Sequence, residues 1–184
     1  MLATRAACAV IRLRSAIAAI LPCAARRVQA CTIMGAVMEI DVVSEIEIAV
    51  SRERVAQFAA DPANATSWRQ IFEEAEPEHV GSPQVGYRVV FVSKVLAGKL
   101  IYTYQVVEHV PGERLVMRTE DGPFPVETTY AWQDAGDGAT RMTLRTSAAP
   151  KKHTTKLSVR LMAKAMRKAD AKDLAKLKAV LERS

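Results

Sequence analysis

The last thirty or so residues of the chain constrain its fold more than any other stretch. Residues 154–183 form a continuous run without glycine or proline, in which apolar and charged residues recur with a helical period. The pattern predicts one long amphipathic helix whose apolar side carries Leu161, Met162, Ala165, Met166, Ala169, Leu174, Leu177, Val180 and Leu181. Because alanine and methionine fill a core poorly by themselves and adapt to a partner, we interpret this helix as a lid over a partly hollow sheet.

The length of 184 residues is that of one domain with a tail, and the charge of the chain is unevenly distributed along it. The net charge of +6 divides into +5 for residues 1–38, −7 for residues 39–150 and +8 for residues 151–184. A basic helix could bind nucleic acid or a membrane surface. It carries no aromatic residue for stacking on bases, so we expect a solvated face and no nucleic-acid partner. No apolar run reaches the ~18 residues that span a bilayer, so we expect no stable membrane insertion.

Residues 1–37 are expected to be a basic extension outside a single domain that covers residues 38–184. The extension contains no acidic residue and holds all the cysteines of the chain, Cys8, Cys23 and Cys31. A domain without cysteine suits a reducing, cytoplasmic location. We interpret the extension as a disordered tail or as the product of a mis-assigned start codon. A secretory signal or an organellar transit peptide, which would export or target the protein, is the alternative.

From residue 39 onward, alternating patterns replace the helical one. Residues 39–50 predict a half-buried strand, and two short helices are expected at 52–60 and 63–69. Six further strands, separated by glycine and proline turns, are expected at 71–80, 87–95, 99–110, 114–120, 126–134 and 140–147. Short turns join antiparallel neighbours. We therefore predict an α+β fold, in which a seven-stranded curved antiparallel sheet carries the long C-terminal helix over its concave face.

Three local features accompany this order of elements. Trp68 ends the second short helix, residues 108–115 form a corner with the sequence EHVPGERL, and residues 138–141 form a GATR turn. From about Met38 to the C-terminus the chain thereby resembles the superfamily of START domains, birch-pollen-allergen-like proteins and polyketide cyclases or dehydrases (SRPBCC). It looks most like the bacterial polyketide cyclase-like branch. The resemblance implies a helix-grip fold with a cavity for a lipid, sterol, polyketide or other apolar ligand.

The candidate pocket residues follow if each strand turns its most apolar face toward the helix. They are Trp68, Phe91, Tyr102, Tyr104, Met117, Thr128, Tyr130, Trp132, Leu144, Met162 and Met166. Arg118 and Glu127 stand in the middle of strands and are candidate polar groups of the pocket, with an outward, solvated orientation as the favoured alternative.

Asp170 and Asp173 fall within or beside the apolar side of the long helix, where a lone buried carboxylate would be costly. We expect them to mark the mouth of the pocket or a point where the helix turns outward. Alternatively, they lie at an exposed end of the helix or pair with Lys176 or Lys178.

The sequence contains no assembled catalytic motif. His79, His109 and His153 lack metal-ligand spacing, the glycines stand singly at turns, and the domain has no cysteine nucleophile. We therefore expect no metal and no cofactor, and the catalytic residues, if there are any, stay unknown. The structural corners behind the resemblance carry over no catalytic residue either.

Two functions are consistent with these features. The first is a binding module, a monomer or weak dimer, that holds a small hydrophobic ligand between the sheet and the C-terminal helix. The alternative is a cyclase, aromatase or dehydratase in which a pocket tyrosine acts as the acid. The enzyme requires at least two of five side chains to converge in one cavity, namely Tyr102, Tyr104, Tyr130, Arg118 and Glu127.

Overall fold

The computed structural model describes residues 39–79, 81–95, 98–149 and 155–183. The predicted extension 1–37, with its three cysteines, lies outside the described residues, and so does His153. Within the described ranges, no helix is both long and apolar enough to cross a membrane.

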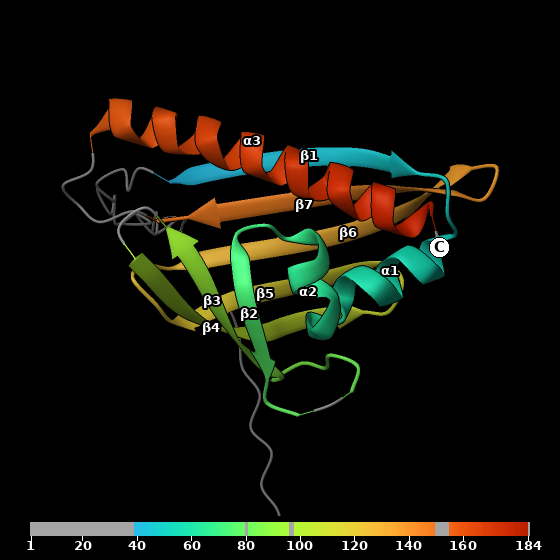
Figure 1. Ribbon diagram of the computed structural model, residues 1–184, viewed down its shortest axis with the longest axis horizontal. Helices are drawn as coiled ribbons and strands as arrows, with labels where there is room; N and C mark the ends of the chain where they lie inside the picture. Colours follow the sequence, from blue (N-terminus) through green and yellow to red (C-terminus); the bar gives the residue numbers. More distant parts are fainter. Residues whose placement is uncertain (1–38, 80, 96–97, 150–154, 184) are drawn as a thin grey trace, which may run out of the picture. The chain divides into compact units, whose positions relative to one another are not determined.

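The described part of the chain contains seven strands and three helices, in the order that the sequence predicts (Figure 1). The strands are β1 (Ile40–Ile48), β2 (Phe72–Pro77), β3 (Arg88–Val95), β4 (Gly98–Val110), β5 (Arg114–Asp121), β6 (Val126–Gly136) and β7 (Ala139–Ala148). The helices are α1 (Arg52–Ala60), α2 (Pro62–Trp68) and α3 (Lys156–Leu181). The largest difference from the predicted boundaries is β2, which is shorter at both ends than the expected strand 71–80.

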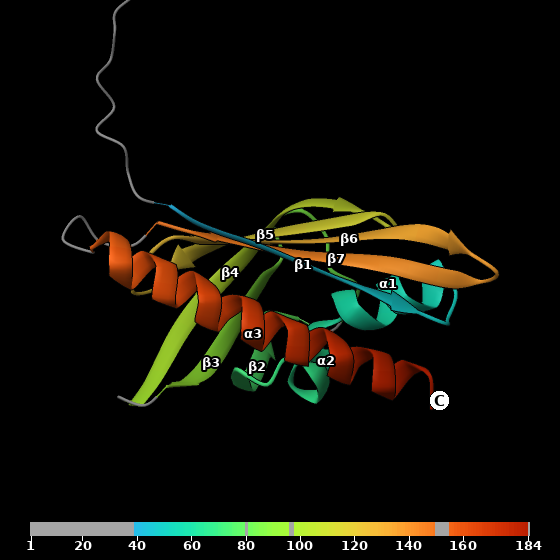
Figure 2. The same cartoon turned by 90° about the horizontal axis from the view of Figure 1, so that it is seen from above.

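All strands belong to one antiparallel sheet with the order β1-β7-β6-β5-β4-β3-β2. Strands β2 to β7 follow one another as a meander, and β1 then pairs with the last strand, from Ile40 opposite Ala148 to Ile48 opposite Thr140. Register shifts between β4 and β5 increase the local twist. Figure 2 shows the result: β3 and β4 run at a steep angle to β1, β6 and β7, so the sheet is strongly bent.

The two faces of the sheet differ as the alternating sequence requires. Along β6 and β7 the buried positions coincide in register, with Thr128 opposite Thr146 and Tyr130 opposite Leu144. The intervening positions carry exposed ion pairs such as Arg145 with Asp41 at 2.7 Å. The concave face is therefore the apolar one, and the helices lie against it.

Helix α1 contacts β6 and β7, α2 contacts β2 and α3, and α3 contacts β1. Asp61 ends α1 in an extended conformation, and its carboxylate accepts a hydrogen bond from the N–H of Ala63 at the start of α2. Thr155 caps α3 in the same way through the N–H of Ser158. The elements follow in the order one strand, two short helices, six strands and one long helix. This is a helix-grip fold, as predicted.

The buried side of α3 differs from the predicted stripe at its N-terminal end. The fully buried residues are Asp170, Asp173, Leu174, Leu177 and Leu181. Leu161 was expected among them but is 60% exposed. At 100° per residue, Leu161 lies sixteen positions before the buried Leu177 and therefore points about 160° away from it around the helix. Val159 lies eighteen positions before Leu177, which is five full turns, so it points the same way as Leu177. The expectation for Leu161 is wrong because Leu161 and Leu177 do not share one side of a straight helix.

Candidate functional site

Nine of the predicted pocket residues are buried on the concave side of the fold. They are Trp68, Phe91, Tyr102, Tyr104, Met117, Thr128, Tyr130, Trp132 and Leu144, and each is less than 9% exposed. Met162 and Met166 are partly buried in a smaller cluster, against Ile40, Val42 and Ala148. The strand parity that the alternation predicts is therefore correct for these side chains, while their role in binding stays a prediction.

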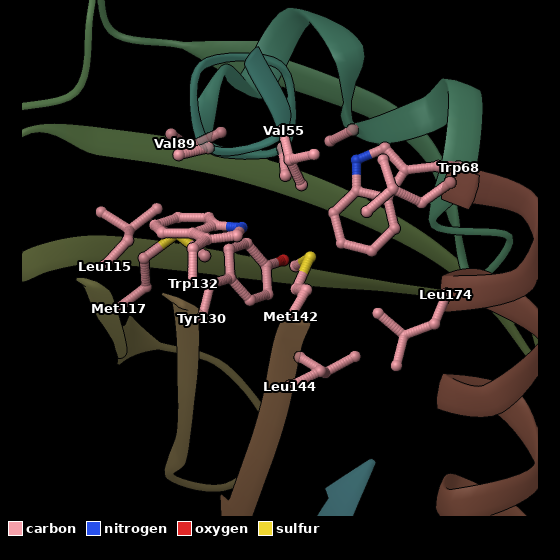
Figure 3. Close-up of a cluster of buried hydrophobic side chains, with 14 of the residues drawn as sticks. Val55, Trp68, Val89, Leu115, Met117, Tyr130, Trp132, Met142, Leu144 and Leu174 are labelled. Atoms are coloured by element: carbon pink, nitrogen blue, oxygen red, sulfur yellow. The ribbon is translucent and has the colours of Figure 1, made fainter. Parts of the chain in front are cut away.

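Trp132, Tyr130 and Trp68 lie one after another on this face, and we call these three rings the aromatic row (Figure 3). Tyr130 occupies its centre, with its ring centroid 5.6 Å from that of Trp68 and 6.1 Å from that of Trp132. On the other strands, Tyr104 lies 5.7 Å from Phe91 and 6.1 Å from Tyr102. Trp68 enters the row from the end of α2, so the sheet and the short helices together build this surface.

Sequence analysis missed a buried charged group beside this row. Arg69 follows Trp68 directly and is only 6% exposed, and its guanidinium lies over the rings of Trp68 and Phe72, 5.6 Å from each centroid. Its Nη1 lies 3.4 Å from Oδ1 of Asp170, and its Nε lies 3.5 Å from Oδ2 of Asp173. The backbone N–H of Gln70 donates to Oδ1 of Asp173 at 3.0 Å. We call Arg69, Asp170 and Asp173 the buried triad.

The buried triad settles the placement of the two aspartates. They lie on the buried side of α3 and pair with Arg69, the residue that caps the C-terminal end of α2, so the expected exposed or outward-turning position is wrong. The ion pair of Lys178 is formed with Glu182 at 2.8 Å, and its Nζ also donates to the carbonyl of Glu47. The cost of a lone buried carboxylate is reduced because a cation from another element meets both acids.

Burial shifts the proton affinities of these groups. It raises the pKa of Asp170 and of Asp173, and the opposing effect of Arg69 on each pKa is smaller. Burial alone would lower the pKa of Arg69, but Tyr130, Asp170 and Asp173 outweigh it and the pKa of Arg69 is raised. One guanidinium thus faces two carboxylates, so the positive charge of Arg69 balances only one of the two negative charges.

Several polar atoms of this interior lack a hydrogen-bond partner among the described residues. Trp68 Nε1, Arg69 Nε, Trp132 Nε1, Ser93 Oγ, Thr146 Oγ1 and Asp170 Oδ2 are buried in this way. Buried polar atoms are normally satisfied by protein, water or a bound molecule. Such atoms on an otherwise apolar face indicate a surface suited to a partner with a few polar groups.

A groove of about 660 Å³ opens at the end of the concave face where α1 lies. One wall is α1, with Ala56 and Ala60, and the other is formed by the segment after β2 and the turn between β4 and β5, with Pro83 and Pro111. Trp132 lines it too and is the only predicted pocket residue that does. The groove has the volume of small-molecule sites.

Polar side chains stand at the rim of the groove. His79 and His109 are among its lining residues, as are Arg52 and Asp61. Tyr87 donates a hydrogen bond from its hydroxyl to the carbonyl of His79, which fixes the segment after β2 against the sheet. Sequence analysis did not predict this groove, because its walls come from turns and a helix that are distant in the chain.

Arg118 and Glu127 are not part of the site. They form an exposed ion pair on the convex face, with Arg118 Nε 2.5 Å from Glu127 Oε2. The inward orientation is therefore wrong and the favoured outward one is correct. The reason is parity, because Met117 and Thr128, which are adjacent to them in the chain and paired with each other, take the inner positions.

Comparison with solved structures supports the fold. A protein of Thermus thermophilus is 22% identical with a TM-score of 0.66, over 78% of this chain and 99% of that one. A START superfamily protein from Mycobacterium smegmatis is 15% identical with a TM-score of 0.65, over 78% and 97%. The Zhui aromatase/cyclase from Streptomyces sp. R1128 is 16% identical with a TM-score of 0.67, over 79% and 95%. At these identities the likeness concerns the fold alone.

Comparison by sequence gives the family. No curated protein matches the chain. The sequence pattern of the family described as "Polyketide cyclase / dehydrase and lipid transport" matches residues 39–182, which include every strand, all three helices, the aromatic row and the buried triad. The chain therefore belongs to the polyketide cyclase / dehydrase and lipid transport family.

Proposed function

We propose that this protein binds a small, largely apolar ligand on the concave side of its sheet, and that the groove beside α1 is the way in. The observation that carries the proposal is the position of Trp132. Its indole lines the groove and also stands in the aromatic row, 6.1 Å from Tyr130. Trp132 therefore joins the wall of the groove to the rings of Tyr130 and Trp68.

The chemistry of this surface fits an apolar ligand with few polar groups. The described walls carry three alanines, three prolines, Tyr87 and Trp132 beside seven polar or charged residues, and the indole N–H of Trp132 has no acceptor within the described part of the chain. Apolar walls with a small number of placed polar groups are typical of small-molecule sites. The family description, which includes lipid transport, is consistent with such a ligand.

A titration with N-phenyl-1-naphthylamine, a neutral apolar dye that fluoresces when it leaves water, tests the proposal. We expect saturable binding of one dye molecule per chain. Ala63→Trp places a large side chain in the groove from an exposed position in α2, so it should weaken dye binding by about tenfold or more.

Ala171→Trp is the matched control for this titration, because Ala171 is an exposed alanine of α3 that does not line the groove. It should leave dye binding unchanged. Equal effects of the two substitutions, or no saturable binding to the unmodified protein, would contradict the proposal.

A cyclase or aromatase activity is the second candidate, and it is favoured by three tyrosines that share the concave face, although none of them lines the groove. Tyr102, Tyr104 and Tyr130 are all buried on the concave face, whereas Arg118 and Glu127 are not. Burial raises the pKa of each of the three phenols. Their hydroxyls stay protonated at neutral pH and can donate hydrogen bonds to a carbonyl or enolate oxygen, while the raised pKa makes each phenol a weaker proton donor.

Replacement of the central phenols tests this activity with a linear poly-β-ketone thioester as substrate. If Tyr130 or Tyr104 is the acid, Tyr130→Phe or Tyr104→Phe should slow turnover by about a hundredfold or more, because the acid is lost. Dye binding should change by less than about threefold, because the ring remains. Turnover that is equal in all three proteins, or absent from the unmodified one, would rule out the acid role.

A further inference from the structure

The buried triad is an unbalanced group of charges inside the fold. Arg69, Asp170 and Asp173 are 6%, 5% and 2% exposed, so one cation and two acids share a region with little access to water. With both acids ionised, the group carries a net charge of −1. An uncompensated charge at such depth favours either a proton or another positive group nearby.

The spare acceptor of the triad is one oxygen of Asp170. In Asp173, Oδ1 accepts a hydrogen bond from the N–H of Gln70 at 3.0 Å, and Oδ2 forms an ion pair with Arg69 Nε at 3.5 Å in which Nε makes no hydrogen bond. In Asp170, Oδ1 faces Arg69 Nη1 at 3.4 Å, while Oδ2 meets no hydrogen-bond donor from the described ranges. A buried carboxylate oxygen of this kind is a place where a donor would be bound.

The triad is connected to the aromatic row and through it to the groove. The guanidinium of Arg69 lies over Trp68, Trp68 contacts Tyr130, and Tyr130 contacts Trp132 at the groove. The charges of Asp170, Asp173 and Arg69 also reach Tyr130, where they act on the pKa of its phenol. None of the three triad residues lines the groove, so an elongated apolar molecule that enters at Trp132 would have to separate these packed rings to bring its polar end to the triad.

We propose that the ligand carries a hydrogen-bond donor at its polar end, best a primary ammonium group and next a hydroxyl, and that carboxylate ligands are disfavoured. This inference rests on the proposed function. An ammonium group would supply the missing positive charge and donate to Asp170 Oδ2, whereas a carboxylate would add a third anion to the two aspartates. The preference for an ammonium group over a carboxylate follows from the charges of the triad, which are two carboxylates and one guanidinium.

The preference should depend on pH in a direction that the surrounding groups determine. Arg69 from α2, Tyr130 from β6, Tyr104 from β4 and Lys176 from α3 are the groups that act on the triad. At low pH a proton occupies the poorly compensated acid and competes with an ammonium group. As the pH rises through the raised pKa of Asp170, that proton leaves and amine binding strengthens.

Competition between ligands of one chain length tests the inference, with displacement of bound N-phenyl-1-naphthylamine as the readout. Decylamine, decanol and decanoic acid differ only in the polar end. At neutral pH we expect decylamine to displace the dye at a concentration at least about tenfold below that of decanoic acid, with decanol between them. The advantage of the amine over decanol, two ligands whose charge does not change below neutral pH, should increase as the pH rises from the ordinary aspartate range toward neutral, because the pKa of Asp170 is raised.

Asp170→Asn should reduce the advantage of the amine to less than about threefold and remove its pH dependence. Asp41→Asn is the control, because Asp41 is an exposed aspartate that pairs with Arg145 on the convex face. Decanoic acid that displaces the dye as well as decylamine would overturn the inference and leave the binding function intact. Failure of the dye itself to bind would instead overturn the proposed function. The pH dependence is measured on the unmodified protein, so the inference can still be tested if the Asp170→Asn variant does not fold.

Discussion

Replacement of Arg69 by methionine is expected to lower the free energy of unfolding by about 3–5 kcal/mol at neutral pH, because it leaves two buried carboxylates without their cation. Methionine keeps much of the apolar volume of the arginine stem, so the loss is mainly electrostatic. Urea denaturation followed by circular dichroism measures it.

The pH dependence of this loss has a definite sign. The folded-state pKa values of Asp170 and Asp173 are raised by burial, and Arg69 is the main group that opposes the rise. Without Arg69 both pKa values rise further. Acids with raised folded-state pKa values favour the folded state at low pH and lose that contribution as the pH rises. The destabilisation should therefore shrink as the pH is lowered from neutral toward about 4.

Two further variants isolate the cause of the effect. Arg118→Met makes the same substitution in an exposed ion pair, whose arginine side chain is 62% exposed, and should change the free energy of unfolding by no more than about 1 kcal/mol. The triple variant Arg69→Met, Asp170→Asn, Asp173→Asn removes the charges together and should recover much of the lost stability. If Arg69→Met lowered the free energy of unfolding by the same amount at every pH, or by no more than Arg118→Met does, Arg69 would not be the cation that balances two buried carboxylates.

The second large effect is expected from Leu177 in the C-terminal half of α3. Leu177 is fully buried against the main core, whereas Leu161 of the same helix is 60% exposed. Leu177→Ala should lower the free energy of unfolding by about 2–5 kcal/mol through lost burial and the cavity that remains. Leu161→Ala should change it by less than about 0.5 kcal/mol.

This pair of substitutions compares one residue type at two positions of one helix, so differences in helix propensity cancel. Chemical denaturation of both variants gives the comparison directly. Similar losses for the two leucines would mean that α3 packs along the stripe first predicted from the sequence, with Leu161 inside.

The sheet could be predicted from the sequence because its signals are local. Alternation in β6 and β7 assigns Thr128, Tyr130 and Leu144 to one face, and the turns between the strands leave an antiparallel meander as the simplest arrangement. The same alternation favoured an outward orientation for Arg118, and the structure agrees. Elements whose register depends on neighbouring residues alone were therefore predicted well.

The buried triad depends on residues that are far apart in the chain and could not be derived in this way. An arginine at the end of a short helix is normally expected to be solvated, and the partner that buries Arg69 lies 101 positions later. The sequence did indicate that Asp170 and Asp173 lie on the apolar side of α3, where they need a partner. It did not indicate which cation pairs with them, because that depends on the packing of α2 against α3.

The central claim is that an apolar ligand reaches the concave face, and the two indole N–H groups of the chain test it most directly. Trp68 and Trp132 are the only tryptophans, and both indole nitrogens are buried without a hydrogen-bond acceptor in the described residues. In a proton–nitrogen correlation spectrum they give two resolved signals, which Trp132→Phe assigns. Addition of N-phenyl-1-naphthylamine should shift the Trp132 signal in a saturable manner and give nuclear Overhauser contacts between its indole proton and the dye. Two indole signals that stay unchanged while dye fluorescence saturates would place the dye elsewhere and contradict the claim.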